Sequence, residues 1–327
     1  MIWLQFLITA AIIVFAANQL AKNGDIIAVR TGLSGMFIGT LLMAGATSLP
    51  ELLSAVNALS IDSPGLAAGS MFGSGMFNMF MLAVLDLINQ QARVLRRVAM
   101  NHALTGSLAN LLTALAIFFV LADIPTRLGW VGVDSLVIVA AYVIGVRLLQ
   151  QQNNGSTPAA GEIGPGVPPL GKALLGFGLA TLALVFVTPY MVESANGIAE
   201  ITGLSSGFVG ATFIGITTSL PELVATIAAS RIGAYDLAIG NLFGSNLFNM
   251  FALALTDVFY LDGQFISEID PSFALIGILV IVLTSLGLVG NIARMERRLW
   301  IVEADALLIL LGYLFGMWFL YSRGIGA

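Results

Sequence analysis

Two glutamates inside apolar segments offer the most chemistry in this sequence. Glu51 ends the string Gly-Ala-Thr-Ser-Leu-Pro-Glu, and Glu222 ends Ile-Thr-Thr-Ser-Leu-Pro-Glu after a shift of 171 positions. A charged side chain inside a membrane segment is costly, so two glutamates at duplicated positions indicate an ion or substrate site between two repeats. On a helix, the Thr and Ser four and three residues earlier share each glutamate's face. These residues are Thr47, Ser48, Thr218 and Ser219.

A second pair of strings repeats with the same shift. Phe-Gly-Ser-Gly-Met-Phe-Asn-Met begins at Phe72, and Phe-Gly-Ser-Asn-Leu-Phe-Asn-Met begins at Phe243. Each string places a serine and an asparagine four residues apart, on one face of a helix. These residues are Ser74, Asn78, Ser245 and Asn249.

Together the two motifs predict a cation site built from oxygen atoms. They offer carboxylate, amide and hydroxyl oxygens, and Pro50 and Pro221 each free a carbonyl group from its helical donor. Such a shell suits hard cations such as Ca²⁺ or Na⁺ rather than Zn²⁺ or Cu⁺. The candidate ligands are Glu51, Glu222, Asn78, Asn249, Thr47, Ser48, Ser74, Thr218, Ser219 and Ser245. We expect no resident cofactor, since the ions are cargo.

The composition is that of an integral membrane protein. Apolar residues make up 58% of the chain and charged residues 9%, against about 25% charged residues in a soluble domain. The absence of Cys excludes disulfides and thiol metal sites, and a single His excludes a His-based metal cluster. No basic patch indicates nucleic acid. An enzyme is disfavoured because the serines have no His partner and there is no acidic pair at catalytic spacing.

Ten apolar segments near the bilayer-spanning length predict the fold class: an all-α integral membrane protein with two inverted five-helix repeats. The repeats occupy residues 1–149 and 171–327, and a flexible linker of Gly, Pro, Ser and Asn joins them over residues 150–170. An odd number of spans in each half makes the second half enter the membrane from the opposite side. The predicted spans are 2–22, 33–59, 64–88, 100–121, 128–149, 171–196, 204–230, 235–259, 272–292 and 300–321.

The charges predict the orientation. With ten spans, all Lys and Arg except Arg127 and Arg323 lie on one side of the membrane. The positive-inside rule places that side in the cytoplasm. We therefore expect a cell-membrane protein with a cytoplasmic linker and both termini outside.

Four other polar residues lie near predicted span ends. Asp86 and Asp257 are either residues at the mouths of an ion path or plain helix-end charges, and the sequence leaves both interpretations open. Glu193 lies near an outer helix end and its role is open. His102 is expected in a solvated cytoplasmic loop.

The doubled motifs resemble the α-repeats of the sodium/calcium exchanger family, within the calcium/cation antiporter superfamily, and above all its compact prokaryotic members. The resemblance covers essentially the whole chain. It implies Ca²⁺ export driven by Na⁺ entry, with alternating access at a mid-membrane site. Glu51 and Glu222 would then bind both ions, the six hydroxyl residues would bind Na⁺, and Asn78 and Asn249 would complete the centre.

The sequence departs from the family pattern in two ways that leave the stoichiometry open. Gly75 stands where Asn is common, although the second copy has the usual Asn246, and Ser70 likewise replaces Asn. Asn249 stands where some relatives have Asp, so the centre holds two carboxylates.

Two other functions remain open. An H⁺-coupled antiporter of Ca²⁺ or another cation would have the same architecture. The Ser-Leu-Pro-Glu motif differs from the Gly-Asn-x-x-Glu form of proton-coupled exchangers, which favours Na⁺. A passive cation channel usually gathers its filter from several subunits, and the internal repeat argues against one. The expected partners are Ca²⁺, Na⁺ and the lipid bilayer. The oligomeric state is open, and a monomer is compatible with the repeat.

Overall fold

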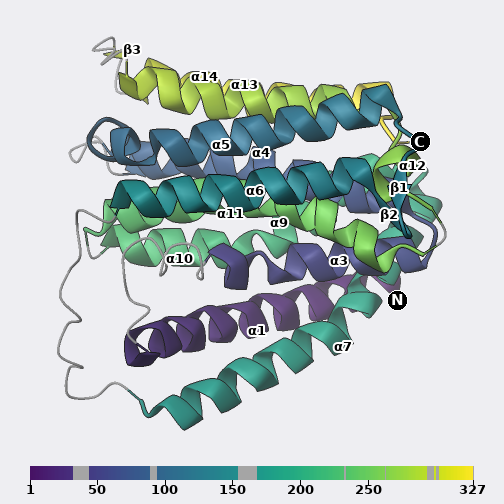
Figure 1. Cartoon of the computed structure of the whole chain (residues 1–327), viewed down its shortest axis with the longest axis horizontal. Helices are drawn as coiled ribbons and strands as arrows, with labels where there is room; N and C mark the ends of the chain where they lie inside the picture. Colours follow the sequence, from purple (N-terminus) through teal and green to yellow (C-terminus); the bar gives the residue numbers. More distant parts are fainter. Residues whose placement is uncertain are drawn as a thin grey trace.

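The computed structural model describes residues 1–31, 44–88, 94–153, 168–231, 233–261, 263–292, 298–299 and 302–326. Its long helices run side by side (Figure 1). Within these ranges, seven helices are long and apolar enough to cross a membrane, or eight if the bent pair Ser206–Thr218 and Leu220–Arg231 is one span. The predicted helical, multi-pass membrane fold is confirmed. Ten spans in two inverted repeats stay a prediction.

The helices follow the predicted spans in order. Those of the first half are α1 (Ile2–Thr31), α3 (Leu49–Ser60), α4 (Pro64–Ile88), α5 (Val94–Ala122) and α6 (Val133–Asn153), and residues 44–47 are also helical. Those of the second half are α7 (Leu170–Thr202), α8 (Ser206–Val209), the π-helical turn η1 (Gly210–Ile214), α9 (Gly215–Thr218), α10 (Leu220–Arg231), α11 (Tyr235–Thr256), the 3₁₀ turn η2 (Asp257–Phe259), α12 (Phe265–Glu268), α13 (Phe273–Ile292) and α14 (Ala304–Arg323).

Several predicted boundaries were wrong. The helices expected from residues 128 and 300 begin at Val133 and Ala304. The residues before them pair as short antiparallel hairpins, β1 (Arg127–Leu128) with β2 (Val131–Gly132) and β3 (Arg298–Leu299) with β4 (Val302–Glu303). In the first hairpin Gly129 makes the turn at φ 71°, a conformation that glycine adopts without steric cost.

The linker was also predicted too long, because α6 continues to Asn153. A helix need not end where the bilayer ends, and polar residues such as those at the end of α6 are good helix formers in water. Residues 154–167 of the linker and residues 33–43 of the second predicted span lie outside the described part of the chain.

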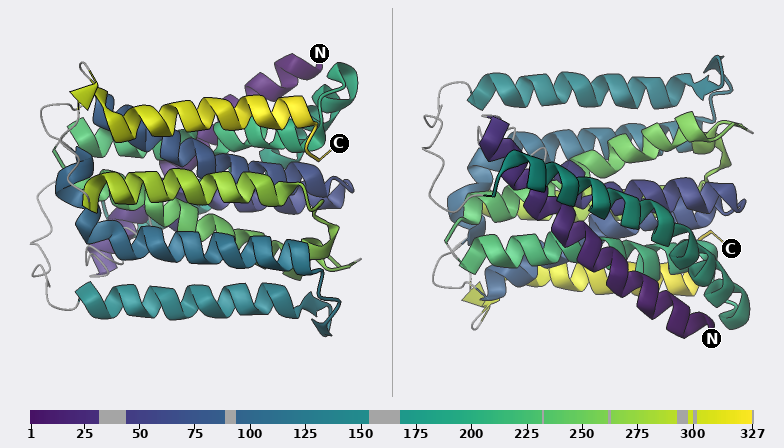
Figure 2. Two further views of the ribbon diagram at one scale, coloured as in Figure 1. Left: turned by 90° about the horizontal axis from the view of Figure 1, so that it is seen from above. Right: turned by 90° about the horizontal axis from the view of Figure 1, so that it is seen from below.

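The motif helices occupy the centre of the bundle. In α4 and α11, 78% and 72% of the most apolar stretch is buried, against 33% in α1 and 17% in α7. Helices α1 and α7 pack against each other along one side of the bundle (Figures 1 and 2). The motifs are therefore surrounded by protein, while α1 and α7 present most of their surface outward.

Glycines let α4 approach the second half at backbone contact. A Cβ atom at Gly73 would overlap the backbone of Ala211, and one at Gly69 would overlap the carbonyl of Gly207. Small residues permit such close helix crossings in membranes. The two halves therefore meet tightly beside the serine and asparagine of the motif.

Candidate cation site

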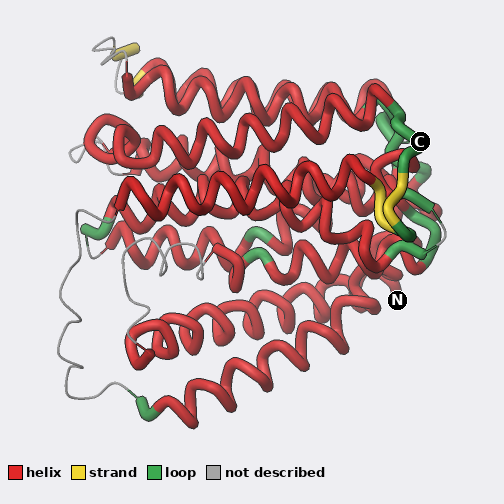
Figure 3. The backbone as a smooth tube through the Cα atoms, viewed as in Figure 1, coloured by secondary structure: helices red, strands yellow, loops and turns green. Residues whose placement is uncertain are grey.

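Two breaks in the middle of the bundle position the glutamates. The helices are interrupted at Ser48 and Ser219, and Figure 3 shows non-helical backbone in the bundle centre. Each break is followed by Leu-Pro, and proline is tolerated in the first turn of a new helix. Glu51 and Glu222 consequently lie in the first turns of α3 and α10. The partial positive charge of a helix N-terminus favours a carboxylate there.

All ten candidate ligands are buried, and each side chain is at most 1% exposed. They come from α3, α4, α9, α10 and α11, from the helical residues 44–47, and from the breaks at Ser48 and Ser219. The sequence motifs of both halves thus lie in the protein interior rather than on the lipid-facing surface.

Serines from one half hold the glutamate of the other. Ser48 donates a hydrogen bond to Glu222 Oε1 at 3.0 Å. Ser219 donates to Glu51 Oε1 at 3.3 Å. These two contacts are equivalent under the 171-residue shift, so the site has the approximate two-fold pattern that a duplicated motif produces.

A second pair of serines completes the pattern. Ser74 on α4 donates to Glu51 Oε1 at 3.4 Å, and Ser245 on α11 donates to Glu222 Oε1 at 3.3 Å. Ser74 Oγ also lies 2.6 Å from Ser219 Oγ. The Oε1 atom of each carboxylate therefore lies within hydrogen-bonding distance of two serine hydroxyls, one from each half of the chain.

Four oxygens at the centre have no donor. Oε2 of Glu51 and of Glu222, and Oδ1 of Asn78 and of Asn249, are buried and accept no hydrogen bond from the described residues. Leaving a buried acceptor unsatisfied costs about 1–3 kcal/mol. Two carboxylate and two amide oxygens in one interior region form a ligand set that a hard cation would satisfy.

The threonines add further oxygens. Thr47 donates to the Ala44 carbonyl at 3.2 Å, and Thr218 donates to the Ile214 carbonyl at 3.1 Å. Because each hydrogen is directed back to the helix, the lone pairs of each hydroxyl stay available to a cation.

Two polar residues near the site were not among the predicted ligands. Asn246 bonds to Asn78 and to the Gly75 carbonyl. Asn241 donates to the Glu222 carbonyl at 3.5 Å and to Thr226 at 3.4 Å. For Asn246 the sequence does hold a signal, namely the Gly-to-Asn difference between the two copies of the motif.

The other acidic residues lie elsewhere. Asp257 is fully buried and accepts backbone hydrogen bonds from Gly132 at 2.7 Å and Phe265 at 2.6 Å. This favours the helix-end interpretation, because both of its oxygens hold loops at the end of α11. Asp86 is also buried, at 3% exposure, and Glu193 is exposed on α7.

The expectation for His102 was wrong. It lies within α5, its side chain is 13% exposed, and its Nε2 is 3.7 Å from Asp236 Oδ1. The predicted span 100–121 already includes His102, and the side chain is buried because it packs against the start of α11 instead of facing solvent.

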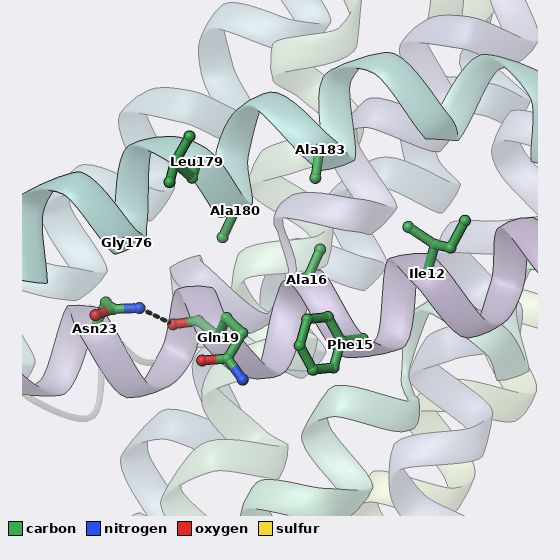
Figure 4. A pocket seen from close by; sticks show the side chains of 9 residues that line it. All are labelled: Ile12, Phe15, Ala16, Gln19, Asn23, Gly176, Leu179, Ala180 and Ala183. Carbon is green, nitrogen blue, oxygen red and sulfur yellow. Dashed lines mark hydrogen bonds between the residues drawn. The ribbon is translucent and has the colours of Figure 1, made fainter.

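A pocket of about 280 Å³ between α1 and α7 contains none of the candidate ligands (Figure 4). Its lining is mostly apolar. The Asn23 amide within it donates to the Gln19 carbonyl at 2.7 Å, on the same helix. This pocket therefore does not offer the oxygen ligands that a cation needs.

Comparisons with known proteins agree with the architecture. Among curated proteins, the sodium/calcium exchanger MaX1 of Methanosarcina acetivorans is 27% identical over 96% of this chain and 100% of its own length. The inner membrane protein YrbG of Escherichia coli is 27% identical over 80% of this chain and 79% of its own.

Solved exchanger structures share the fold. The sodium-calcium exchanger NCX_Mj has 22% identity and a TM-score of 0.59, with 97% of this chain and 99% of that chain covered. The H⁺/Ca²⁺ exchanger CAX has 15% identity and a TM-score of 0.68, with 99% and 89% covered. At these identities the likeness shows the fold alone. The family model described as sodium/calcium exchanger protein matches residues 1–149 and 172–322, and the chain therefore belongs to the sodium/calcium exchanger protein family.

Proposed function

We propose that this protein is a secondary antiporter that exports Ca²⁺ in exchange for Na⁺ at one mid-membrane site shared by the two ions. The observation that carries the proposal is the set of four buried oxygens without a donor, on Glu51, Glu222, Asn78 and Asn249. They come from both halves of the chain.

The charge of the site supports a divalent ion. Glu51 and Glu222 are fully buried, and among the described residues neither forms an ion pair with a Lys or Arg. Two buried carboxylates that lack a cationic partner are strongly disfavoured. One Ca²⁺ or two Na⁺ would neutralise them, so the two ions would compete for the same oxygens.

The hydroxyl groups favour Na⁺ over H⁺ as the counter-ion. A carboxylate binds a proton without help, whereas Na⁺ needs about five or six oxygen ligands. Four serine hydroxyls contact the two glutamates in a two-fold pattern, and the buried hydroxyls of Thr47 and Thr218 precede each break. Because relatives include both a sodium/calcium exchanger and an H⁺/Ca²⁺ exchanger, the proton-coupled antiporter is the alternative that an experiment must test.

Transport would occur by alternating access between two inverted repeats, which are joined by a cytoplasmic linker between the end of α6 at Asn153 and the start of α7 at Leu170. The reciprocal serine–glutamate contacts support this arrangement, as does a family match in two segments with nearly the same bounds. Ions would bind when the site faces one side, and the neutralised site would then open to the other.

The test is Ca²⁺ uptake into vesicles that contain the purified protein. Vesicles loaded with Na⁺, with K⁺ or with acid are placed in the same ⁴⁵Ca²⁺ medium. We expect Ca²⁺ uptake only into the vesicles that were loaded with Na⁺. Uptake that follows the pH gradient and ignores Na⁺ would establish the proton-coupled alternative, and single-channel currents would establish a channel.

A further inference from the structure

The two copies of the serine–asparagine motif differ at two buried positions, and at one of them a polar side chain corresponds to a glycine. Gly75 in α4 corresponds to Asn246 in α11. Asn246 is 2% exposed, and its amide reaches into the first half of the chain. Its Nδ2 donates to the Gly75 carbonyl at 3.3 Å, and its Oδ1 accepts from Asn78 Nδ2 at 2.8 Å. The side chain present in only one copy thus bonds to the backbone of the glycine that replaces it in the other.

These two hydrogen bonds determine which way round the Asn78 amide lies. The Gly75 carbonyl can only accept, so Asn246 must turn its Nδ2 toward it. The Oδ1 of Asn246 then faces Asn78 and can only accept, so Asn78 must present its own Nδ2. The Oδ1 of Asn78 is left directed elsewhere, and it is one of the four oxygens without a donor.

The equivalent Asn249 is held differently. Its Nδ2 donates to Ser74 Oγ at 3.0 Å, and Ser74 in turn contacts Ser219 and Glu51. No side chain at Gly75 exists to orient Asn249 as Asn246 orients Asn78. Asn249 is therefore held by a serine that itself contacts Glu51. Asn78 is held by Asn246, which bonds to the backbone carbonyl of Gly75.

We propose that Asn246 is a positioning residue that keeps the Asn78 oxygen, rather than its NH₂ group, directed at the cation. The inference rests on the proposed function and deepens it. Without Asn246 the Asn78 amide can rotate, and an NH₂ group facing the ion would repel it. We expect a loss of about ten- to hundredfold in Ca²⁺ affinity, by taking the lost contact between the cation and the amide oxygen as comparable to a hydrogen bond to a charged group.

The experiment is a double-mutant cycle on the full-length protein in lipid nanodiscs, with Ca²⁺ affinity measured by calorimetry. We expect Asn246→Ala and Asn78→Ala each to weaken Ca²⁺ binding about ten- to hundredfold. We expect the double variant to bind no more weakly than Asn78→Ala, because no amide is left to orient. Asn246→Leu fills the same space without a donor or acceptor and makes the same test if the alanine variant does not fold.

Asn110→Ala is the matched control. Asn110 on α5 donates to Ser285 on α13 at 3.0 Å, so it also joins the two halves, but away from the site. It should lower thermal stability without changing Ca²⁺ affinity. The inference would be overturned if the folded Asn246 variants bound Ca²⁺ with wild-type affinity. It would also be overturned if the loss of Ca²⁺ affinity in the double variant equalled the sum of the two single losses in free energy. Absence of Ca²⁺ binding by the wild-type protein would instead overturn the proposed function.

Discussion

Neutralising either glutamate is the perturbation that tests the site most directly. Glu51→Gln and Glu222→Gln keep the shape of the side chain and remove one of two buried charges. Each Oε1 lies within hydrogen-bonding distance of two serine hydroxyls, one from each half. Since the two carboxylates have equivalent surroundings, we expect both variants to lose Ca²⁺ exchange to a similar extent.

The magnitude follows from the charge and burial of the pair. A carboxylate oxygen about 2.4 Å from Ca²⁺ attracts it by about 14 kcal/mol at an effective dielectric constant of about 20. Much of this attraction is offset by desolvation, and removing one partner of a buried charge pair typically costs about 3–5 kcal/mol. We therefore expect Ca²⁺ affinity to fall by about 10²- to 10⁴-fold in each variant.

The assay is ⁴⁵Ca²⁺ uptake by Na⁺-loaded vesicles over a range of Ca²⁺ concentrations, with calorimetry on the same preparations. Glu193→Gln is the matched control, because Glu193 is exposed on α7. It should exchange Ca²⁺ like the wild type. A Glu51 or Glu222 variant that is folded and exchanges Ca²⁺ at nearly the wild-type rate would refute the site. A large loss in only one of them would refute the equivalence of the halves.

Three further predictions concern coupling, charge and orientation. Ser74→Ala together with Ser245→Ala should raise the external Na⁺ concentration that half-maximally drives Ca²⁺ efflux. Ca²⁺ affinity should change less, because the carboxylates dominate binding of the divalent ion. An unchanged Na⁺ dependence would contradict this prediction. Two carboxylates balance one Ca²⁺ or two Na⁺, so Ca²⁺ uptake should not respond to a potential imposed with valinomycin and K⁺; a clear response would indicate a third Na⁺. The chain has no Cys, so single cysteines can report the side of the membrane on which a residue lies. We expect Gly171→Cys, where a side chain meets open space, and Ser322→Cys, at an exposed position, to lie on opposite sides. Labelling of position 171 but not 322 by an impermeant reagent on intact cells would reverse the predicted orientation.

The sequence by itself determined the class of protein and the identity of the candidate ligands. Long apolar segments have few alternatives to membrane helices, because every backbone polar group in lipid must be satisfied within the segment. Glu51 and Glu222 stood out because a charge in such a segment is costly wherever the helix packs. Repetition at a constant shift then marked their serine, threonine and asparagine neighbours.

Local patterns failed where contacts between distant segments decide the structure. The β1–β2 hairpin was missed because Leu128, Trp130 and Val131 extend the apolar run of the helix that follows, and because the hydrogen bond from the Gly132 N–H to Asp257 comes from the other half of the chain. His102 was misplaced because only packing shows that α5 passes the start of α11.

Tertiary structure alone decided how the ligands are paired and oriented. Ser48 and Glu222 are 174 residues apart, and their hydrogen bond exists because the halves pack at backbone contact through Gly73. The sequence shows that Gly75 and Asn246 differ, but not that the Asn246 amide reaches Asn78 across the interface. Composition and spacing specify which atoms are available, whereas the direction of a hydrogen bond between two halves depends on their relative position, which only the packed fold defines.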